Sequence, residues 1–259
     1  MQDEIKIIGI QNFPIIKQND SLIDILIHKI HEESIKIDDG DVIVITQRIC
    51  SISEGRIKNL NDFKPRKFAI DWATKYEKDP RLIEAILQES KSIIRSKNGL
   101  LITETKHGFI CANSGIDNSN VEGIDNICLL PKDPDKTCLQ IKTKIKRILN
   151  KNIAVIMTDT FGRPWRMGQT NIAIGVAGIN PINSYVGQQD IFDRTLNFTE
   201  ICIADEIAGA AELIMGKTKK IPVAILKGYK YKADSDSISN IIRDKNIDNW
   251  FSVWLTVIH

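Results

Sequence analysis

Two acidic residues, Asp117 and Asp159, follow short apolar runs and stand among hydroxyl and amide side chains. One stretch reads ICANSGID and ends at Asp117, and the other reads IAVIMTDT and ends at Thr160. Because both runs are typical of strands, we expect each acidic residue to enter a loop at a strand terminus, where binding sites are commonly built. Each Asp also has a simpler interpretation as a turn former or a helix cap.

These residues offer oxygen ligands. Asp, Thr, Asn and Ser suit a hard ion such as Mg²⁺ or Mn²⁺, which usually shares its shell with nucleotide phosphates. Two arginines after the second run add fork-shaped donors for phosphate or carboxylate. Zinc is not indicated, because the four histidines show no ligand spacing. The residues predict a metal and phosphate site whose catalytic candidates are Asp117, Asp159, Arg163 and Arg166.

Structural interpretations of the neighbouring stretches stay open. Residues 118–120, Asn-Ser-Asn, could form only an Asx-turn. The stretch GQTNIAIGVAG, residues 168–178, could be a close-packed strand and nothing more. No Walker A motif and no dinucleotide fingerprint occurs in the sequence, so motifs alone do not identify a nucleotide.

Composition narrows the class of protein. The chain has 259 residues, 42% hydrophobic and 26% charged, which is ordinary for a soluble globular protein. A net charge of +2 gives no basic field for nucleic acid, and no apolar run reaches the length of a membrane span. Five cysteines without a C-x-x-C pair indicate reduced, mostly buried thiols. Since no signal peptide is evident either, we expect a cytoplasmic protein.

The elements that position these residues can be read from apolar periodicity and capping signals. Strands are expected at 6–10, 42–45, 100–105, 109–113, 153–157 and 222–226. Helices are expected at 21–33, 80–95, 134–151 and 199–215, two of them opened by Asp-Pro pairs and the last ended by Gly216. Strands and helices mix without a βαβ rhythm, so the fold class is α+β. The apolar tail at 250–255 is either a last core segment or a subunit contact.

Four longer motifs carry a family resemblance. They read KHGFICANSGIDNSNV, LLPKDPDKT, TDTFGRPWRMGQTNIAIGVAGI and ADEIAGAAELIMGK. Together they resemble the F-420 gamma-glutamyl ligase family, the coenzyme F-420-0:L-glutamate ligases, from about residue 5 to residue 230. The resemblance implies GTP as co-substrate, Mg²⁺ or Mn²⁺ and K⁺ as ions, and a deazaflavin precursor and L-glutamate as substrates. It also implies a family-specific two-lobed α+β fold with mainly antiparallel sheets, spanning 1–259 as one domain or two interleaved lobes, in an intertwined homodimer.

The resemblance also assigns residues, one by one, at matching motif positions. The metal ligands implied are Asp117, Asp159, Thr160 and Met215. The nucleotide contacts implied are Phe13, Pro14, Ile15, Ile16, Gln47, Arg48, Asn120, Leu213, Ile214, Met215, Gly216 and Lys217.

One departure from the family pattern concerns the nucleotide. The family commonly reads SKAEGR where this chain has SISEGR at 51–56, so Ile52 replaces a lysine that contacts phosphate. Either Arg48 substitutes for that lysine, nucleotide binding is altered, or Ile52 is an ordinary core residue. Two rival functions follow: a relative that binds nucleotide or deazaflavin without ligating, and a paralogue that ligates another acceptor or amino acid.

Overall fold

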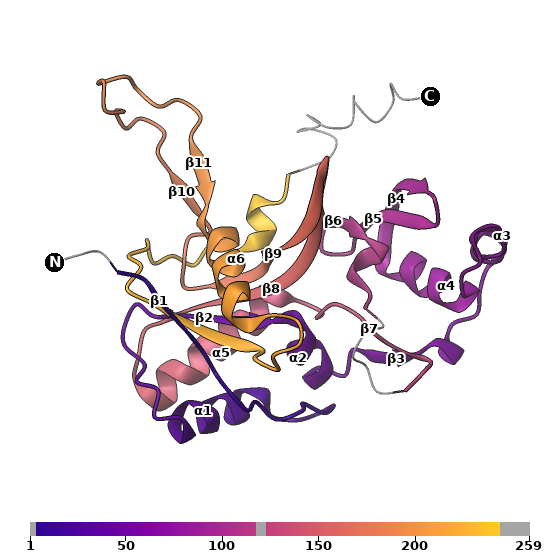
Figure 1. The fold of residues 1–259 in the computed structure, drawn as a ribbon, viewed down its shortest axis with the longest axis horizontal. Helices are drawn as coiled ribbons and strands as arrows, with labels where there is room; N and C mark the ends of the chain where they lie inside the picture. The colour runs from indigo at the N-terminus through magenta and orange to yellow at the C-terminus, as the bar shows by residue number, and fades with distance from the viewer. Residues whose placement is uncertain (1–3, 118–122, 244–259) are drawn as a thin grey trace.

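A five-stranded sheet forms the centre of the α+β fold in the computed structural model, which describes residues 4–117 and 123–243 (Figure 1). Its strand order is β1-β12-β2-β8-β9. The strands are β1 (Lys6–Gly9), β12 (Val223–Lys227), β2 (Val42–Thr46), β8 (Ala154–Arg163) and β9 (Arg166–Ala177). Only β2 and β8 pair in parallel, so the sheet is mainly antiparallel, as predicted.

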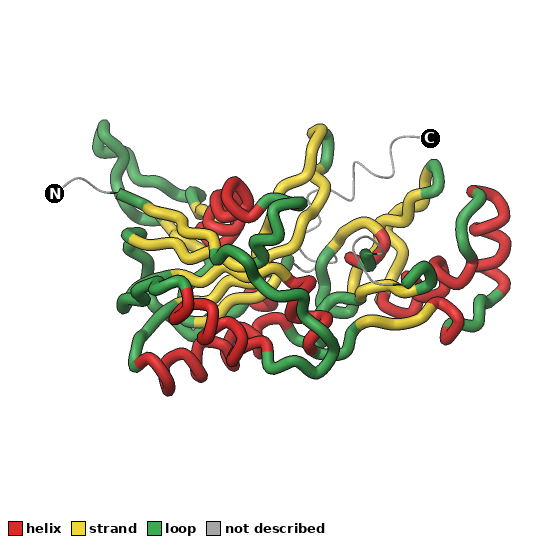
Figure 2. Tube along the Cα trace, turned by 60° about the horizontal axis from the view of Figure 1, so that its bottom comes forward, coloured by secondary structure: helices red, strands yellow, loops and turns green. Residues whose placement is uncertain are grey.

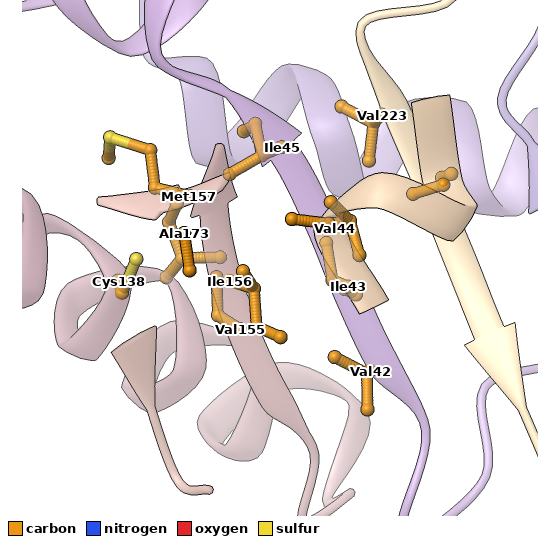
Figure 3. Close-up of a cluster of buried hydrophobic side chains, with 14 of the residues drawn as sticks. Val42, Ile43, Val44, Ile45, Cys138, Val155, Ile156, Met157, Ala173 and Val223 are labelled. Atoms are coloured by element: carbon orange, nitrogen blue, oxygen red, sulfur yellow. The ribbon is translucent and has the colours of Figure 1, made fainter. Parts of the chain in front are cut away.

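The central strands are buried on both faces. The residues of β2 read VIVIT and those at the start of β8 read AVIM. Figure 3 shows the side chains of residues 42–45 and 155–157 packed among neighbouring strands and a helix. Helices α1 (Leu22–Glu32), α2 (Gln47–Ser53) and α5 (Pro134–Leu149) lie on one side of the sheet (Figure 2). Helix α6 (Ile203–Met215) packs on the other side. Continuous apolar runs are what such two-sided burial requires.

A second lobe is inserted between α2 and α5 (Figure 1). It contains β3 (Ile57–Asn59), η1 (Leu60–Asp62), α3 (Lys67–Tyr76), α4 (Pro80–Glu89), β4 (Ser90–Lys97), β5 (Leu100–Thr105), β6 (Ile110–Ala112), η2 (Asn113–Gly115) and β7 (Asn126–Cys128). Its two small hydrophobic clusters, one around Trp72 and one around Leu60, are separate from the main core.

An arm projects from the sheet near α6. Strands β10 (Ile182–Ser184) and β11 (Glu200–Cys202) pair antiparallel, and the loop between them extends away from the body (Figure 1). Its apolar side chains Val186, Ile191, Phe192 and Phe198 are exposed. The last described element is η3 (Ile238–Ile241), and the predicted role of the tail at 250–255 lies outside the described residues.

Several local predictions are confirmed. Asp79 and Asp133 cap α4 and α5 through their side chains, with Pro at the first helical position of each. Gly216 follows the end of α6. The β5–β6 hairpin turns at Gly108, whose φ of 101° lies in the region that favours glycine. All five cysteines are free, and all except Cys202 are buried.

Two helix boundaries predicted from sequence are wrong. The helix that opens at Pro80 ends at Glu89 and does not reach residue 95, because residues 90–97 pair with β5 as a strand. The helix predicted from residue 199 starts only at Ile203, because Glu200–Cys202 pairs with Ile182–Ser184. In both cases pairing with a distant strand overrides the local helix signal.

A third correction matters for function. The apolar strand predicted to end at Met157 continues to Arg163, so Asp159 and Thr160 lie within β8 and not in a loop. Strand β2 stops opposite Thr158, and beyond that point β8 pairs only with β9. The polar residues are therefore held on a strand that extends past the end of its parallel neighbour.

None of the helices in residues 4–117 and 123–243 has the length and apolar character that a membrane span requires.

Candidate functional site

The site forms where β2 ends and β8 continues. Thr46 is the last residue of β2 to pair with β8, and α2 begins at the next residue, Gln47. Asp159 follows directly after Thr158, the partner of Thr46. The first turn of α2 and the polar part of β8 are thus brought together by the parallel pairing of two buried strands.

Asp159 is a half-buried acidic residue of β8. Burial raises its pKa to about 6, and hydrogen bonds from the Thr160 backbone amide and from Gln47 oppose that rise, together with the charges of Lys217 and Arg48. The Ser51 hydroxyl donates to Gln47 Oε1 over 2.8 Å, which leaves the amide NH₂ of Gln47 as the group that faces Asp159. The carboxylate is therefore surrounded by donors and cations but costs free energy to ionise.

Asp117 reaches the same place from the second lobe. Its backbone forms an isolated antiparallel bridge with Cys128, with N–O distances of 3.0 and 2.8 Å. Its carboxylate forms an ion pair with the Arg48 guanidinium, whose charge also acts on Asp159. Arg48 thus links the two predicted carboxylates, one from each lobe.

A ring of four side chains lies next to Asp159 and includes its neighbour Thr160. The Thr160 hydroxyl donates to Asn171 Oδ1 over 2.7 Å, and Asn171 Nδ2 donates to Glu212 Oε2 over 2.9 Å. Lys217 Nζ lies 3.8 Å from Glu212 Oε1 and donates to Thr160 Oγ1, which closes the ring. Asn171 and Glu212 are absent from the residues predicted from sequence, although both lie within the quoted motifs.

The remaining predicted residues differ in how deeply they are buried and in which part of the fold they lie. Phe13 and Ile16 are buried in the main core, whereas Pro14 and Ile15 are exposed on the same loop. Ile214 packs over Gly9, so the last turn of α6 lies against the end of β1.

Met215 is fully buried in the main core, and Leu213 is exposed. Arg163 and Arg166 pair across the β8–β9 turn, where the Arg163 guanidinium donates to the Met167 carbonyl. Asn120 lies outside the described residues.

The donor set fits a hard divalent ion that shares its shell with phosphates. Two carboxylates, Asp117 and Asp159, and the Thr160 hydroxyl supply oxygen ligands only. Within residues 4–117 and 123–243, no group of three or more His, Cys, Asp and Glu side chains could hold a metal ion alone. Any ion at this place would need further oxygens from a ligand, and Arg48 and Lys217 are suited to bind that ligand's negative charge.

A cavity of about 650 Å³ lies elsewhere, between the β5–β6 turn, the start of α5 and residues 234–242. Phe109, Pro134, Val176 and Ile242 are among the side chains that line it, and none of the predicted site residues does. It is therefore distinct from the polar cluster around Asp159.

The fold and this cluster define an α+β protein with an oxygen-rich polar site at the open end of a mixed sheet. The chain belongs to the F420-0:Gamma-glutamyl ligase family, whose sequence profile matches residues 10–228. It is 39% identical over 249 residues to "Coenzyme F420:L-glutamate ligase" of Methanothermobacter thermautotrophicus, covering 94% of this chain and 98% of that protein. The protein of the same name from Methanocaldococcus jannaschii is 41% identical over 213 residues, covering 82% of this chain and 85% of the relative. The protein of the same name from Methanopyrus kandleri is 36% identical over 199 residues, covering 76% of this chain and 79% of the relative.

The raised pKa of Asp159 predicts how stability varies with pH in metal-free protein. Because the folded pKa of about 6 exceeds the unfolded value of about 3.8, protonated Asp159 stabilises the fold below about pH 4. That contribution is lost as pH rises through about 6. Asp159→Asn should therefore raise the free energy of unfolding by about 2 kcal/mol more at pH 8 than at pH 4.5.

Urea unfolding of wild-type and Asp159→Asn protein in the presence of a chelator measures this difference. Burial also raises the pKa of the half-buried Asp205, which lies outside the cluster, so Asp205→Asn should change stability with pH in the same direction and serves as a comparison. An equal effect of Asp159→Asn on the free energy of unfolding at both pH values would show that burial does not raise the pKa of this carboxyl group.

Proposed function

We propose that this protein is a GTP-dependent ligase that adds L-glutamate to the deazaflavin precursor F-420-0. Where it adds a further glutamate to the growing glutamate chain, the new bond is a γ linkage. The observation that carries the proposal is the convergence of Asp117, Arg48 and Asp159 at one place, within a chain similar over most of its length to proteins named for this reaction. The proposed co-substrate is GTP, the proposed ions are Mg²⁺ or Mn²⁺ with K⁺, and the proposed compartment is the cytoplasm.

The proposed chemistry has two steps. The acceptor carboxylate attacks the γ-phosphorus of GTP, which forms an acyl phosphate and releases GDP. The deprotonated amine of glutamate then attacks the acyl carbon, which forms the amide and releases phosphate. Bond formation and bond cleavage balance in each step, and GTP is the only energy source required.

The described residues would balance the charge of the phosphates and hold the reacting groups in position. Asp117, Asp159 and Thr160 would hold a divalent ion, whose chemistry is to neutralise charge that develops between phosphates. Arg48 and Lys217 would contact the phosphates of the nucleotide. Gln47, fixed by Ser51, would keep Asp159 oriented toward the ligand. Such preorganised charge is the main requirement for phosphoryl transfer.

A thiol intermediate is not part of this proposal. Cys111 is the cysteine of the 110–117 motif, and burial raises the pKa of its thiol to about 12, with a further rise from the charge of Asp159. A thiol with that pKa is almost entirely protonated at neutral pH and is a poor nucleophile. The acyl group is therefore expected on phosphate and not on sulfur.

Hydroxylamine trapping tests the acyl phosphate. Protein incubated with F-420-0, GTP and Mn²⁺, without glutamate, should convert added hydroxylamine into the hydroxamate of the acceptor. The same incubation without GTP is the control. Hydroxamate formation that does not depend on nucleotide, or its absence while ligation proceeds, would contradict the proposed mechanism.

We also propose the homodimer that the family resemblance implies. The exposed apolar side chains of the β10–β11 arm, among them Phe192 and Phe198, support it because a projecting apolar segment is typical of an interface. The double variant Phe192→Asp/Phe198→Asp should elute as a monomer in size-exclusion chromatography with light scattering. A dimer in the variant, or a monomer in the wild type, would refute this role of the arm.

A further inference from the structure

The chain crosses twice between the main lobe, which holds the five-stranded sheet, and the second lobe. Residues 54–56 lead out between α2 and β3, and residues 129–132 lead back between β7 and α5 (Figure 1). Leu129 packs in a cluster of the second lobe, whereas Leu130 packs in the main core, so the boundary between the lobes falls between these two residues. The Leu129 amide donates to the Arg56 carbonyl over 3.1 Å, which joins the two crossings.

Both charged residues of the outgoing crossing also bind the returning one through their side chains. The Glu54 carboxylate accepts from the Lys132 amide over 3.2 Å and from the Thr137 hydroxyl of α5 over 2.6 Å. Arg56 Nε donates to the Leu130 carbonyl over 2.8 Å. The SEGR part of the motif at 51–56 thus fastens the two crossings together.

Arg56 holds the second lobe as well. Its Nη2 donates to Glu89 Oε2 at the end of α4 over 2.7 Å, and the two side chains are only 14% and 15% exposed. Glu89 Oε1 accepts from Lys106 Nζ over 3.0 Å, which brings the β5–β6 turn to the same contact. Charge-assisted hydrogen bonds of a planar guanidinium are strong and directional. One side chain therefore joins α4 of the second lobe to the segment that returns to the main lobe.

The position of Asp117 depends on this junction. Ile57, the neighbour of Arg56, pairs with Cys128 in the β3–β7 ladder. Cys128 also pairs with Asp117, whose carboxylate forms the ion pair with Arg48 of α2. Paired backbone thus runs without a break from the crossing at Arg56 to the carboxylate that the second lobe contributes to the site.

We infer that Arg56, held by Glu89, is a positioning residue that orients the second lobe and so sets Asp117 against Arg48. It acts through β7 and needs no contact with nucleotide or acceptor. This deepens the proposed function, on which it rests for the role of Asp117 in holding a divalent ion.

The lobes also meet through an apolar contact. The rings of Phe109 and Phe161 lie edge to face with centroids 6.1 Å apart, and both residues are buried. Hydrophobic burial holds surfaces together but is not directional. We therefore assign the orientation of the second lobe to the hydrogen bonds of Arg56 and not to this contact.

Amide hydrogen exchange, resolved to single residues, tests this assignment in the full chain without nucleotide, metal or acceptor. The amides of Asp117 and Cys128, here called the bridge amides, each donate to the carbonyl of the other residue. In Arg56→Met they should exchange at least about tenfold faster than in wild type, as expected for loss of one charge-assisted hydrogen bond. Amides in the β2–β8 pairing should keep their wild-type rates. Arg56 lines a cleft of about 210 Å³, so the change opens no hole in the core.

Arg66→Met is the matched control. Arg66 Nε donates to Glu84 Oε1 over 2.9 Å, an arginine–glutamate pair that lies wholly within the second lobe. This variant should leave the bridge amides at their wild-type rates. Glu89→Gln keeps the shape of the Arg56 partner and removes its charge, so it should accelerate the bridge amides in the same direction and provides the test if Arg56→Met does not fold.

Ligation kinetics give a second readout. Arg56→Met should lower kcat by about ten- to a hundredfold, because a displacement of about 1 Å at a group that positions reactants can have that effect. The Mn²⁺ concentration that gives half the maximal rate should rise, since Asp117 is a proposed ligand. The KM for GTP should change little, because the second lobe is not proposed to hold the nucleotide through Arg56.

Three results would overturn the inference. Wild-type rates of the bridge amides in folded Arg56→Met and Glu89→Gln would leave the apolar contact as the element that orients the lobe. Equal acceleration in the β2–β8 pairing would reduce Arg56 to a contributor to global stability. The same acceleration in Arg66→Met would make the effect common to any ion pair of the second lobe. Failure of the proposed function appears separately, as wild-type protein with protected bridge amides that does not ligate.

Discussion

Asp117→Asn and Asp159→Asn should each lower the rate of ligation by about a thousandfold while the protein stays folded. Both carboxylates converge on Arg48, one from the second lobe and one from the extended part of β8. Replacement of either with a neutral amide removes an anionic ligand for the proposed ion and leaves a cation unbalanced. The loss of metal-assisted charge stabilisation is expected to cost about 4 kcal/mol in the transition state, which corresponds to this change in rate.

Steady-state kinetics with saturating GTP and acceptor measure this loss. Asp205→Asn is the control, because Asp205 is a half-buried carboxyl group that accepts from the Ala173 amide and lies outside the cluster. Circular dichroism establishes that each variant is folded. Near-normal turnover in both folded variants at Asp117 and Asp159 would remove the metal site from the proposal.

Arg48→Ala should weaken GTP binding by about ten- to a hundredfold, whereas Ile52→Lys should give no gain. Arg48 stands in the first turn of α2, within reach of both carboxylates, and Ile52 packs against the main core one turn later. This arrangement favours the interpretation that Arg48 replaces the family lysine. A charge-assisted hydrogen bond contributes roughly 1.5–3 kcal/mol, which sets the expected change in affinity.

Titration of GTP into wild type and both variants distinguishes the alternatives. Tighter binding by Ile52→Lys would mean that the missing lysine is not compensated. Unchanged affinity in both variants would mean that α2 does not contact the nucleotide, and the N-terminal half of the proposed site would be wrong. The Lys219→Met variant controls for the loss of a cation that contacts the Leu213 carbonyl instead.

Sequence reasoning predicts elements well where the signal is local. Continuous apolar runs identify β2 and the start of β8, and Asp-Pro pairs mark the first turns of α4 and α5. The prediction fails where pairing with a strand distant in sequence determines the secondary structure. Ser90–Lys97 and Glu200–Cys202 are strands because they pair with β5 and β10. The polar end of β8 is misread for the same reason, since β9 extends that strand to Arg163.

The candidate site is predictable in part. Asp117, Asp159 and Thr160 can be chosen because their residue types and their positions after apolar runs indicate oxygen ligands. Asn171 and Glu212 cannot be chosen that way, because each resembles an ordinary residue of a strand or a helix. Register pairs Thr160 with Asn171, and packing of α6 on β9 places Glu212 beside Asn171. Only these tertiary relations reveal the ring, although the family resemblance already names two of its members, Thr160 and Lys217.

The mass of the product tests the central claim most directly. Purified protein incubated with F-420-0, GTP, Mn²⁺ and L-glutamate should give a product heavier by one or more glutamyl residues, with one GDP and one phosphate released per residue added. Omission of GTP, or replacement of L-glutamate by L-aspartate, should abolish the product. An unchanged acceptor mass in the complete mixture, with folded protein that binds GTP and Mn²⁺, would contradict the assignment as an F-420-0:L-glutamate ligase.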